Sequence, residues 1–366
     1  MITDSSTHSY MTNPCSHTVA VEVWLPGERG FFVVLINGVF EGGGVKGVSL
    51  AGAVQGAQDC GVQFNRVAGT SSGSIVAALL AAGYRAEEMK EIIESTPFAS
   101  LLQRSPIFNT RWIGPATRLF LKKGLYSGEA LESWIRKMLA QKGIRTFADL
   151  PPGKLLITAS DISNGNILVL PDDIRRFGIE PSKLEVAKAV RMSCSIPYFF
   201  DPVIIRKSPM MSKGLPFQDQ FVYVVDGGLL SNFPLWLFDG ERSESGGEII
   251  PVVGFKMVGK TEVEPARIKG PLTMLQALVE TMLTAHDERY IEQINRFRTV
   301  KIPTLGIKPT QFNLSVQDST NLYRSGVASG LEFFTTWNTK MYNEQLEKQR
   351  KEMRKKQADS PPLVPI

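Results

Sequence analysis

The sequence has few cysteines and no long apolar run. Cys15, Cys60 and Cys194 are the only cysteines among its 366 residues. They are too few for a disulfide-stapled scaffold and too widely spaced for a thiolate zinc site, so a reducing, cytoplasmic compartment is the simplest setting. The strongest apolar run, residues 75–82, is far shorter than the roughly 20 residues that span a bilayer. We therefore expect a soluble protein.

Histidine is equally scarce. His8 and His17 lie in a polar N-terminal stretch, where a rigid catalytic base is not expected. His286 shares a predicted helical stripe with Val279 and Met282, and histidines on such a face are usually packed and hydrogen-bonded. A histidine-dependent active site therefore has a single, weak candidate.

The chain carries a slight excess of positive charge. Its 41 Lys and Arg against 36 Asp and Glu give a net charge of +5, and 43% of its residues are hydrophobic. This composition excludes a disordered chain, and the charge is compatible with an anionic surface. The most basic segment, residues 340–356, has no aromatic residue after Tyr342, so nucleic acid is not expected as a partner.

Strand and helix patterns alternate along the chain. The predicted strands are residues 19–25, 31–40, 64–68, 154–160, 221–225 and 249–255. The predicted helices are residues 48–59, 74–82, 184–193 and 272–297, and residues 84–145 are mostly helical. This alternation predicts a three-layer α/β/α sandwich with a mainly parallel central sheet.

One glycine-flanked serine follows a predicted strand. Gly69-Thr70-Ser71-Ser72-Gly73 matches the pattern G-x-S-x-G. In this pattern the serine sits on a sharp strand-to-helix turn that exposes its hydroxyl, and the glycines leave room for the turn. Ser71 is therefore a candidate nucleophile, with a plain glycine turn as the alternative.

A second glycine-rich loop, Gly42-Gly43-Gly44-Val45-Lys46-Gly47, also leads from a strand into a helix. Such a loop turns backbone N–H groups toward an anion. A dinucleotide site, a phosphate loop, an oxyanion hole and a structural turn remain possible for it. The phosphate loop is weakened because Gly47, and no Ser or Thr, follows Lys46. The dinucleotide site is weakened because the next strand leads into the candidate serine turn and shows no acidic residue at its end.

An acidic residue ends another predicted strand. Asp226 is followed by Gly227 and Gly228, and an acid in this position can point into a site at the carboxyl edge of a sheet, although an ordinary Asp-Gly turn is equally compatible. The order Ser71, Asp226, His286 also matches the chain order of an α/β-hydrolase triad, which stays open as an alternative.

These blocks, in this order, resemble the signature segments of patatin-like phospholipases. Further stretches are similar to family segments as well, namely residues 124–128, 146–150 and 193–200. The resemblance covers roughly residues 32–240. It implies a catalytic domain over residues 19–340, with a flexible tail at 1–18 and a basic tail at 341–366.

The resemblance implies a serine lipid acyl hydrolase that uses a Ser–Asp dyad and needs no metal or cofactor. Ser71 is then the nucleophile and Asp226 its general base. The implied oxyanion hole is formed by the amides of Gly42, Gly43 and Gly44. Lys46 and Gly47 are the expected substrate-binding residues.

The implied substrate is membrane phospholipid or another acyl lipid, cleaved as by a phospholipase A or lysophospholipase and met by peripheral membrane association. An activating partner or ligand is a further expectation, because some relatives have one. The aromatic segment with Ile196, Tyr198, Phe199 and Phe200 is a candidate apolar slot, and residues 98–120 are a candidate cover. A triad esterase and a non-catalytic lipid- or phosphate-binding module are the alternatives.

Overall fold

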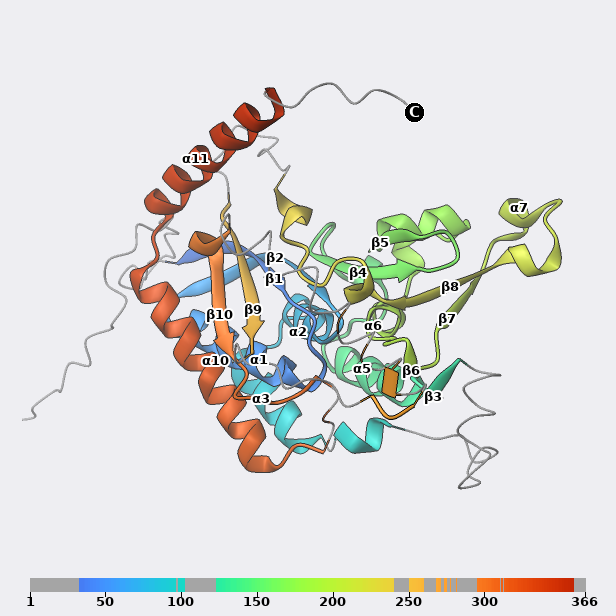
Figure 1. The fold of residues 1–366 in the computed structure, drawn as a ribbon, viewed down its shortest axis with the longest axis horizontal. Helices are drawn as coiled ribbons and strands as arrows, with labels where there is room; N and C mark the ends of the chain where they lie inside the picture. Colours follow the sequence, from blue (N-terminus) through green and yellow to red (C-terminus); the bar gives the residue numbers. More distant parts are fainter. Residues whose placement is uncertain are drawn as a thin grey trace, which may run out of the picture.

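The computed structural model describes residues 33–96, 98–102, 123–239, 250–259, 268–270, 273–274, 277, 281, 295–309, 311 and 313–358. Strands and helices alternate along these residues (Figure 1). They form an eight-stranded sheet and a separate two-stranded sheet.

Five neighbouring strands of the central sheet run parallel. They are, in order across the sheet, β10 (Thr299–Pro303), β9 (Val252–Val258), β1 (Val34–Phe40), β2 (Val62–Thr70) and β4 (Leu155–Asp161). The remaining strands join in antiparallel pairs and are β8 (Phe221–Asp226), β7 (Val203–Arg206) and β5 (Asn166–Leu170). The predicted α/β class with a mainly parallel central sheet is confirmed.

Side chains alternate between the two faces of these strands. On one face, Phe40, Ile157 and Phe255 belong to a large apolar core that four helices complete. These helices are α1 (Val48–Asp59), α2 (Ser72–Ala81), α6 (Val186–Ser193) and α10 (Val316–Thr336). On the other face, among the described residues, Val39 and its neighbours pack against Phe233 and the 3₁₀ turn η9 (Leu235–Phe238).

Further helices surround this first layer. They are α3 (Ala86–Ser95), α5 (Glu129–Gln141) and α11 (Thr339–Ala358). α11 is tied to the sheet because the Tyr342 hydroxyl accepts a hydrogen bond of 3.0 Å from the amide of Val252.

Helices α1 and α10 cross at backbone distance. A methyl group built on Gly52 would lie 2.0 Å from the Tyr323 carbonyl oxygen, and one built on Gly326 would lie 2.0 Å from that of Ser49. Gly56 and Gly330 repeat the same contact one turn further along. The four glycines therefore let the two helices approach more closely than any side chain would allow.

Several predictions about individual elements can be compared with the structure. The predicted helix at residues 48–59 coincides with α1. The mostly helical interpretation of residues 84–145 is wrong at β3 (Gly124–Tyr126), which pairs with β6 (Tyr198–Phe200), because the partner strand is distant in sequence. The predicted strand 19–25 lies outside the described residues. So does most of the predicted helix 272–297, whose end at Arg296–Arg298 is a 3₁₀ helix.

Two further features of the described residues concern membrane spans and cysteines. No helix within the described ranges combines the length and apolar character needed to cross a bilayer. Cys194 is a free, buried thiol.

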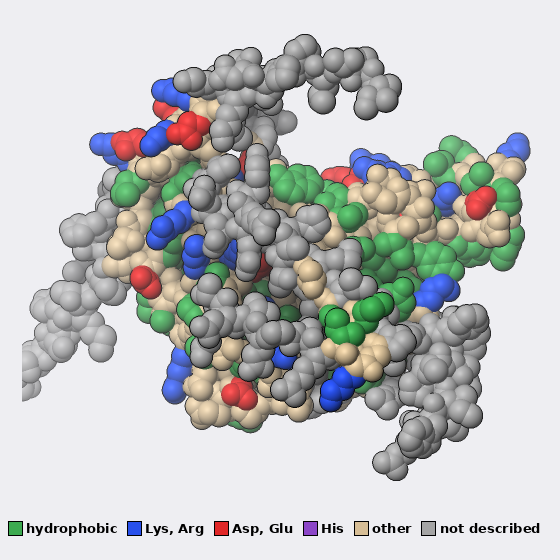
Figure 2. Space-filling view, in the orientation of Figure 1, with side chains coloured by type: hydrophobic (Ala, Val, Ile, Leu, Met, Phe, Trp, Pro, Cys, Tyr) green, Lys and Arg blue, Asp and Glu red, His purple; other side chains and the backbone are tan. Residues whose placement is uncertain are grey.

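Strands β7 and β8 extend away from the rest of the molecule. The short helix α7 (Pro209–Ser212) lies between them at their far end (Figure 1). Hydrophobic and basic side chains share the surface of this end (Figure 2).

Candidate active site

Ser71 occupies a strained turn between β2 and α2. Its backbone has φ 51° and ψ −126°, a region that side-chain-bearing residues rarely adopt and that costs on the order of 1–3 kcal/mol. The turn is held by a hydrogen bond of 2.8 Å from the Ser71 amide to the Ser193 hydroxyl.

The glycines on either side of Ser71 are required by close packing. A methyl group built on Gly69 would lie 2.3 Å from the Gly73 carbonyl oxygen, and one built on Gly73 would lie 2.3 Å from that of Phe40. The turn therefore packs directly against its own second half and against the end of β1. The spacing in G-x-S-x-G reflects these two backbone contacts.

β2 and β8 meet end to end along one edge of β4. β2 runs parallel to β4 and pairs Thr70 with Thr158, whereas β8 runs antiparallel and pairs Asp226 with Ala159. β5 occupies the other edge of β4. Because Thr158 and Ala159 are consecutive, the residue after Thr70 arrives beside Asp226. The sheet itself thus brings Ser71 and Asp226 together.

The Ser71 hydroxyl donates a hydrogen bond of 2.7 Å to Oδ2 of Asp226. Both residues are buried, with 6% of Ser71 and 1% of Asp226 exposed. The other carboxylate oxygen of Asp226 accepts a hydrogen bond of 2.8 Å from the Gly228 amide. These two bonds fix the carboxylate in the orientation that a base for Ser71 requires.

The surroundings of Asp226 make it a stronger base than an ordinary aspartate. Burial raises the pKa of Asp226 to about 7, and the hydrogen bonds from Ser71 and Gly228 oppose that rise. Burial raises the pKa because it disfavours the charged form of a carboxyl group. The pKa of Asp226 therefore lies close to neutral pH.

The glycine loop lies against Ser71, and its amides face different acceptors. The amide of Gly42 donates to the carbonyl of Asn232, whose side chain donates back to the Gly42 carbonyl, each at 3.1 Å. The amide of Gly43 donates to the Ser72 hydroxyl at 3.0 Å. Gly44 has φ 58°, and its amide makes no hydrogen bond within the part of the chain that the structure describes.

Lys46 lies in the 3₁₀ turn η1 (Gly44–Gly47) and folds back toward the loop. A methyl group built on Gly43 would lie 3.2 Å from the Cε atom of Lys46. Burial lowers the pKa of Lys46, and the negative charge of Glu41 opposes this effect. The positive charge therefore lies close to the amides of the glycine loop.

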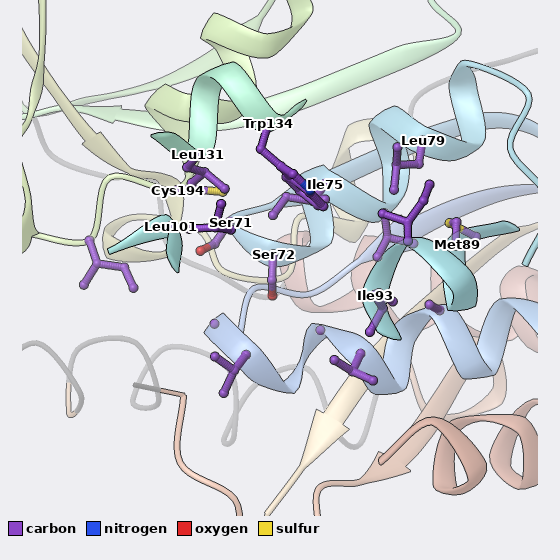
Figure 3. Close-up of a pocket in the computed structure, with 18 of the residues that line it drawn as sticks. Ser71, Ser72, Ile75, Leu79, Met89, Ile93, Leu101, Leu131, Trp134 and Cys194 are labelled. Carbon is purple, nitrogen blue, oxygen red and sulfur yellow. The ribbon is translucent and has the colours of Figure 1, made fainter. Parts of the chain in front are cut away.

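A pocket opens at Ser71 and runs between four helices (Figure 3). Its empty volume is about 840 Å³, counted with its open mouth. Apart from Ser71 and Ser72, apolar side chains and glycines line most of it. They include Val48 and Ala51 of α1, Ile75, Val76 and Leu79 of α2, Met89, Ile92 and Ile93 of α3, and Leu131 and Trp134 of α5. Such a pocket suits a hydrocarbon chain.

The pocket includes some of the predicted substrate residues. Gly47, Ile196 and Phe200 line it, whereas Lys46, Tyr198 and Phe199 are not among its lining residues. Leu101 lines it too, and most of the predicted cover at residues 98–120 lies outside the described residues. His286 also lies outside them.

Sequence reasoning missed several residues of the site. Ser72, Ser193 and Asn232 each hold a backbone group of the two glycine motifs. Ser193 begins one of the segments that resemble the family, which was an available signal. The pocket residues of α3 and α5 gave no signal, because their apolar faces look like those of any packed helix.

Comparisons with known proteins found a matching family and several relatives. The sequence pattern described as "Patatin-like phospholipase" matches residues 38–239. The chain is 39% identical over 307 residues to the uncharacterized protein YqhO of Bacillus subtilis, covering 82% of this chain and 99% of that protein. It is 27% identical over 208 residues to the probable lipid hydrolase 463L of Invertebrate iridescent virus 6, covering 54% of this chain and 61% of that protein.

Two solved structures are distantly similar. VipD from Legionella pneumophila matches with a TM-score of 0.47 and 16% identity, over 82% of this chain and 66% of VipD. ExoU from Pseudomonas aeruginosa, solved with SpcU, matches with a TM-score of 0.41 and 17% identity, over 87% of this chain and 53% of ExoU. The chain thus spans from about half to about two thirds of the length of these structures.

Proposed function

The chain belongs to the patatin-like phospholipase family, a family of lipid ester hydrolases, and on that premise we propose that it hydrolyses membrane phospholipids or lysophospholipids through a Ser71–Asp226 dyad. The observation that carries the proposal is the 2.7 Å hydrogen bond between the two side chains. Ser71 also lines an apolar pocket that is suited to the acyl chain of the substrate.

The first half of the reaction acylates Ser71. The Asp226 carboxylate takes the hydroxyl proton while Oγ of Ser71 attacks the ester carbonyl carbon, and a tetrahedral intermediate with a negatively charged oxygen forms. When the intermediate collapses, the leaving alcohol takes the proton from Asp226 and the acyl group stays on Ser71. In the second half, Asp226 accepts a proton from water as the water attacks the acyl-enzyme. When the second tetrahedral intermediate collapses, Asp226 gives this proton to Oγ of Ser71 and the fatty acid leaves.

The amides of Gly43 and Gly44 are our candidates for stabilising the oxyanion. The Gly42 amide is committed to Asn232, whereas the Gly43 amide exchanges its bond to Ser72 for one to the substrate oxygen. The N-terminus of α2, directly after Ser71, and the charge of Lys46 favour the same negative charge. Losing one oxyanion donor typically costs about 3–4 kcal/mol, or roughly 10²–10³ in turnover.

Labelling with a fluorophosphonate probe, followed by identification of lipid products, tests this function. We expect the probe to modify Ser71 and the protein to release fatty acid from mixed phospholipid vesicles, while Ser71→Ala does neither. A folded protein that stays unlabelled and releases no fatty acid would contradict the proposal. That outcome would favour a binding module that holds a lipid or phosphate without turnover.

A further inference from the structure

The far end of the β7–β8 extension exposes large apolar side chains. The hairpin loop, residues 207–220, includes Met210 with 86% of its surface exposed and Phe217 with 73% exposed. Met211 and Leu215 are exposed in the same loop. Scattered apolar residues are common on surfaces, but several in one projecting loop indicate a surface that binds something.

Basic residues accompany these apolar side chains. Arg206 and Lys213 are exposed and Lys207 is half-buried, against one acid, Asp219, in the same stretch. Figure 2 shows the apolar and basic side chains together at this end of the molecule. Apolar residues next to an excess of Lys and Arg are complementary to a bilayer that contains anionic lipid.

The loop is ordered, so its apolar side chains are displayed by a fixed scaffold. The Lys207 amide donates to the Gln220 carbonyl at 2.8 Å, and the Ser208 amide donates to the Phe177 carbonyl at 2.9 Å, which ties the loop to the body of the protein. Phe217 packs edge-on against Phe221, with ring centroids 5.1 Å apart. A surface that is already ordered loses little conformational freedom on binding.

We propose that the hairpin loop is the surface by which the protein docks on anionic phospholipid bilayers. The proposal rests on the proposed function, which requires access to lipid. Met210 and Phe217 enter the bilayer interface, while Arg206 and Lys213 contact lipid phosphates. β8 runs from this loop directly to Asp226, a distance of about 17 Å at the usual rise per strand residue, so docking brings the active site close to the membrane.

Vesicle sedimentation with the full chain tests the proposal. The vesicles contain phosphatidylcholine, with or without about one third phosphatidylglycerol. The variants are Met210→Asp and Phe217→Asp, each in a Ser71→Ala background so that no lipid is consumed. Met341→Asp is the matched control, because Met341 is a 55% exposed apolar residue on α11.

We expect each hairpin variant to lower the partition onto anionic vesicles by about tenfold or more. Each variant removes one apolar side chain that would enter the bilayer, and it adds a negative charge that anionic lipid repels. The control keeps its partition, and about 0.5 M salt weakens binding of the unmodified protein. With Ser71 restored, the hairpin variants hydrolyse a water-soluble short-chain ester within about twofold of the normal rate and lose hydrolysis of vesicle lipid.

Three outcomes would overturn the docking surface. The hairpin variants bind vesicles as well as the control does, or Met341→Asp lowers binding equally. In the third outcome, the unmodified protein does not bind vesicles and forms an oligomer that the hairpin substitutions dissociate. That result would assign the surface to contact with a second copy of the chain. If the unmodified protein binds vesicles through the hairpin but hydrolyses no ester, the proposed function fails while the docking surface stands.

Discussion

Burial of Asp226 raises its pKa, and this higher pKa suits the proposed role of Asp226 as a general base. A dyad has no imidazole, so its carboxylate must accept the proton of Ser71 without help. Burial raises the pKa of Asp226 to about 7, and a base with a pKa near the working pH balances proton affinity against availability. The strained turn at Ser71 and the buried Asp226 are both unfavourable for folding alone, which is typical of functional sites.

The pH dependence of hydrolysis follows from this pKa. Asp226 accepts a proton only when it is deprotonated, so kcat/KM is expected to rise with pH through about 7 and then level off, by roughly tenfold between about pH 6 and pH 8. The measurement uses a water-soluble ester, so that membrane binding does not change with pH. Circular dichroism at each pH checks that the fold persists. A rate that is flat across this range would contradict a catalytic base with a pKa near 7.

At the scale of elements, we propose that the face that α2 turns toward the pocket sets how much of the acyl chain fits. Ser72, Ile75, Val76 and Leu79 lie on that face. Leu79 is eight residues beyond Ser71, or about 12 Å along the helix axis, the length of an acyl chain of about eight to ten carbons. Figure 3 shows Leu79 and Met89 far from Ser71 along the pocket.

Blocking the pocket part-way is therefore expected to shorten the preferred substrate. Ile75→Trp places a large ring about 6 Å from Ser71 along α2, so we expect the optimum to fall from about eight carbons to about four. The assay compares kcat/KM for p-nitrophenyl esters of increasing chain length. Val316→Trp is the control, because Val316 is 81% exposed and lies outside the pocket. An unchanged chain-length profile for Ile75→Trp would mean that the acyl chain binds elsewhere.

The crossing of α1 and α10 gives a second prediction at this scale. Gly52→Ala is expected to destabilise the protein by about 3 kcal/mol, the upper end for overpacking, because the new methyl group meets backbone that cannot yield. Alanine is intrinsically a better helix former than glycine, so any loss of stability must come from the contact between α1 and α10. Urea unfolding measures the change, with Gly259→Ala as control, since a methyl group there meets no described residue within 4 Å. Equal stability of Gly52→Ala and the unmodified protein would contradict the close packing.

At the scale of the whole molecule, the sequence predicted those elements and motifs that depend on the local pattern of residues. Strands β1, β2, β4, β8 and β9, the serine turn, the glycine loop and the position of Asp226 at a strand end were visible in the sequence, whereas β5, β7, β10 and α10 were not predicted. Local pattern gave no indication that β2 and β8 meet on one edge of β4, because that arrangement is set by pairing across the sheet. It also gave no indication that Asn232 holds Gly42, or that four helices enclose a pocket, because both need tertiary contacts.

The hairpin loop illustrates the same limit. Its apolar residues are interrupted by Ser, Lys, Gly and Pro, so no run or periodicity marks them in the sequence. Only the projection of β7 and β8 beyond the body reveals that these side chains are exposed together. An exposed surface of this kind becomes visible only once the fold is known.

The most direct test of the dyad compares three variants on one soluble ester. Ser71→Ala, Asp226→Ala and His286→Ala are assayed for kcat/KM, with thermal unfolding to confirm that each is folded. Removing either member of a serine–base pair is expected to cost a factor on the order of 10³ or more. We predict this loss for Ser71→Ala and Asp226→Ala, and we expect His286→Ala to keep most of the activity. A loss for His286→Ala as large as that for Ser71→Ala, in a folded protein, would contradict the dyad and establish a histidine-containing triad.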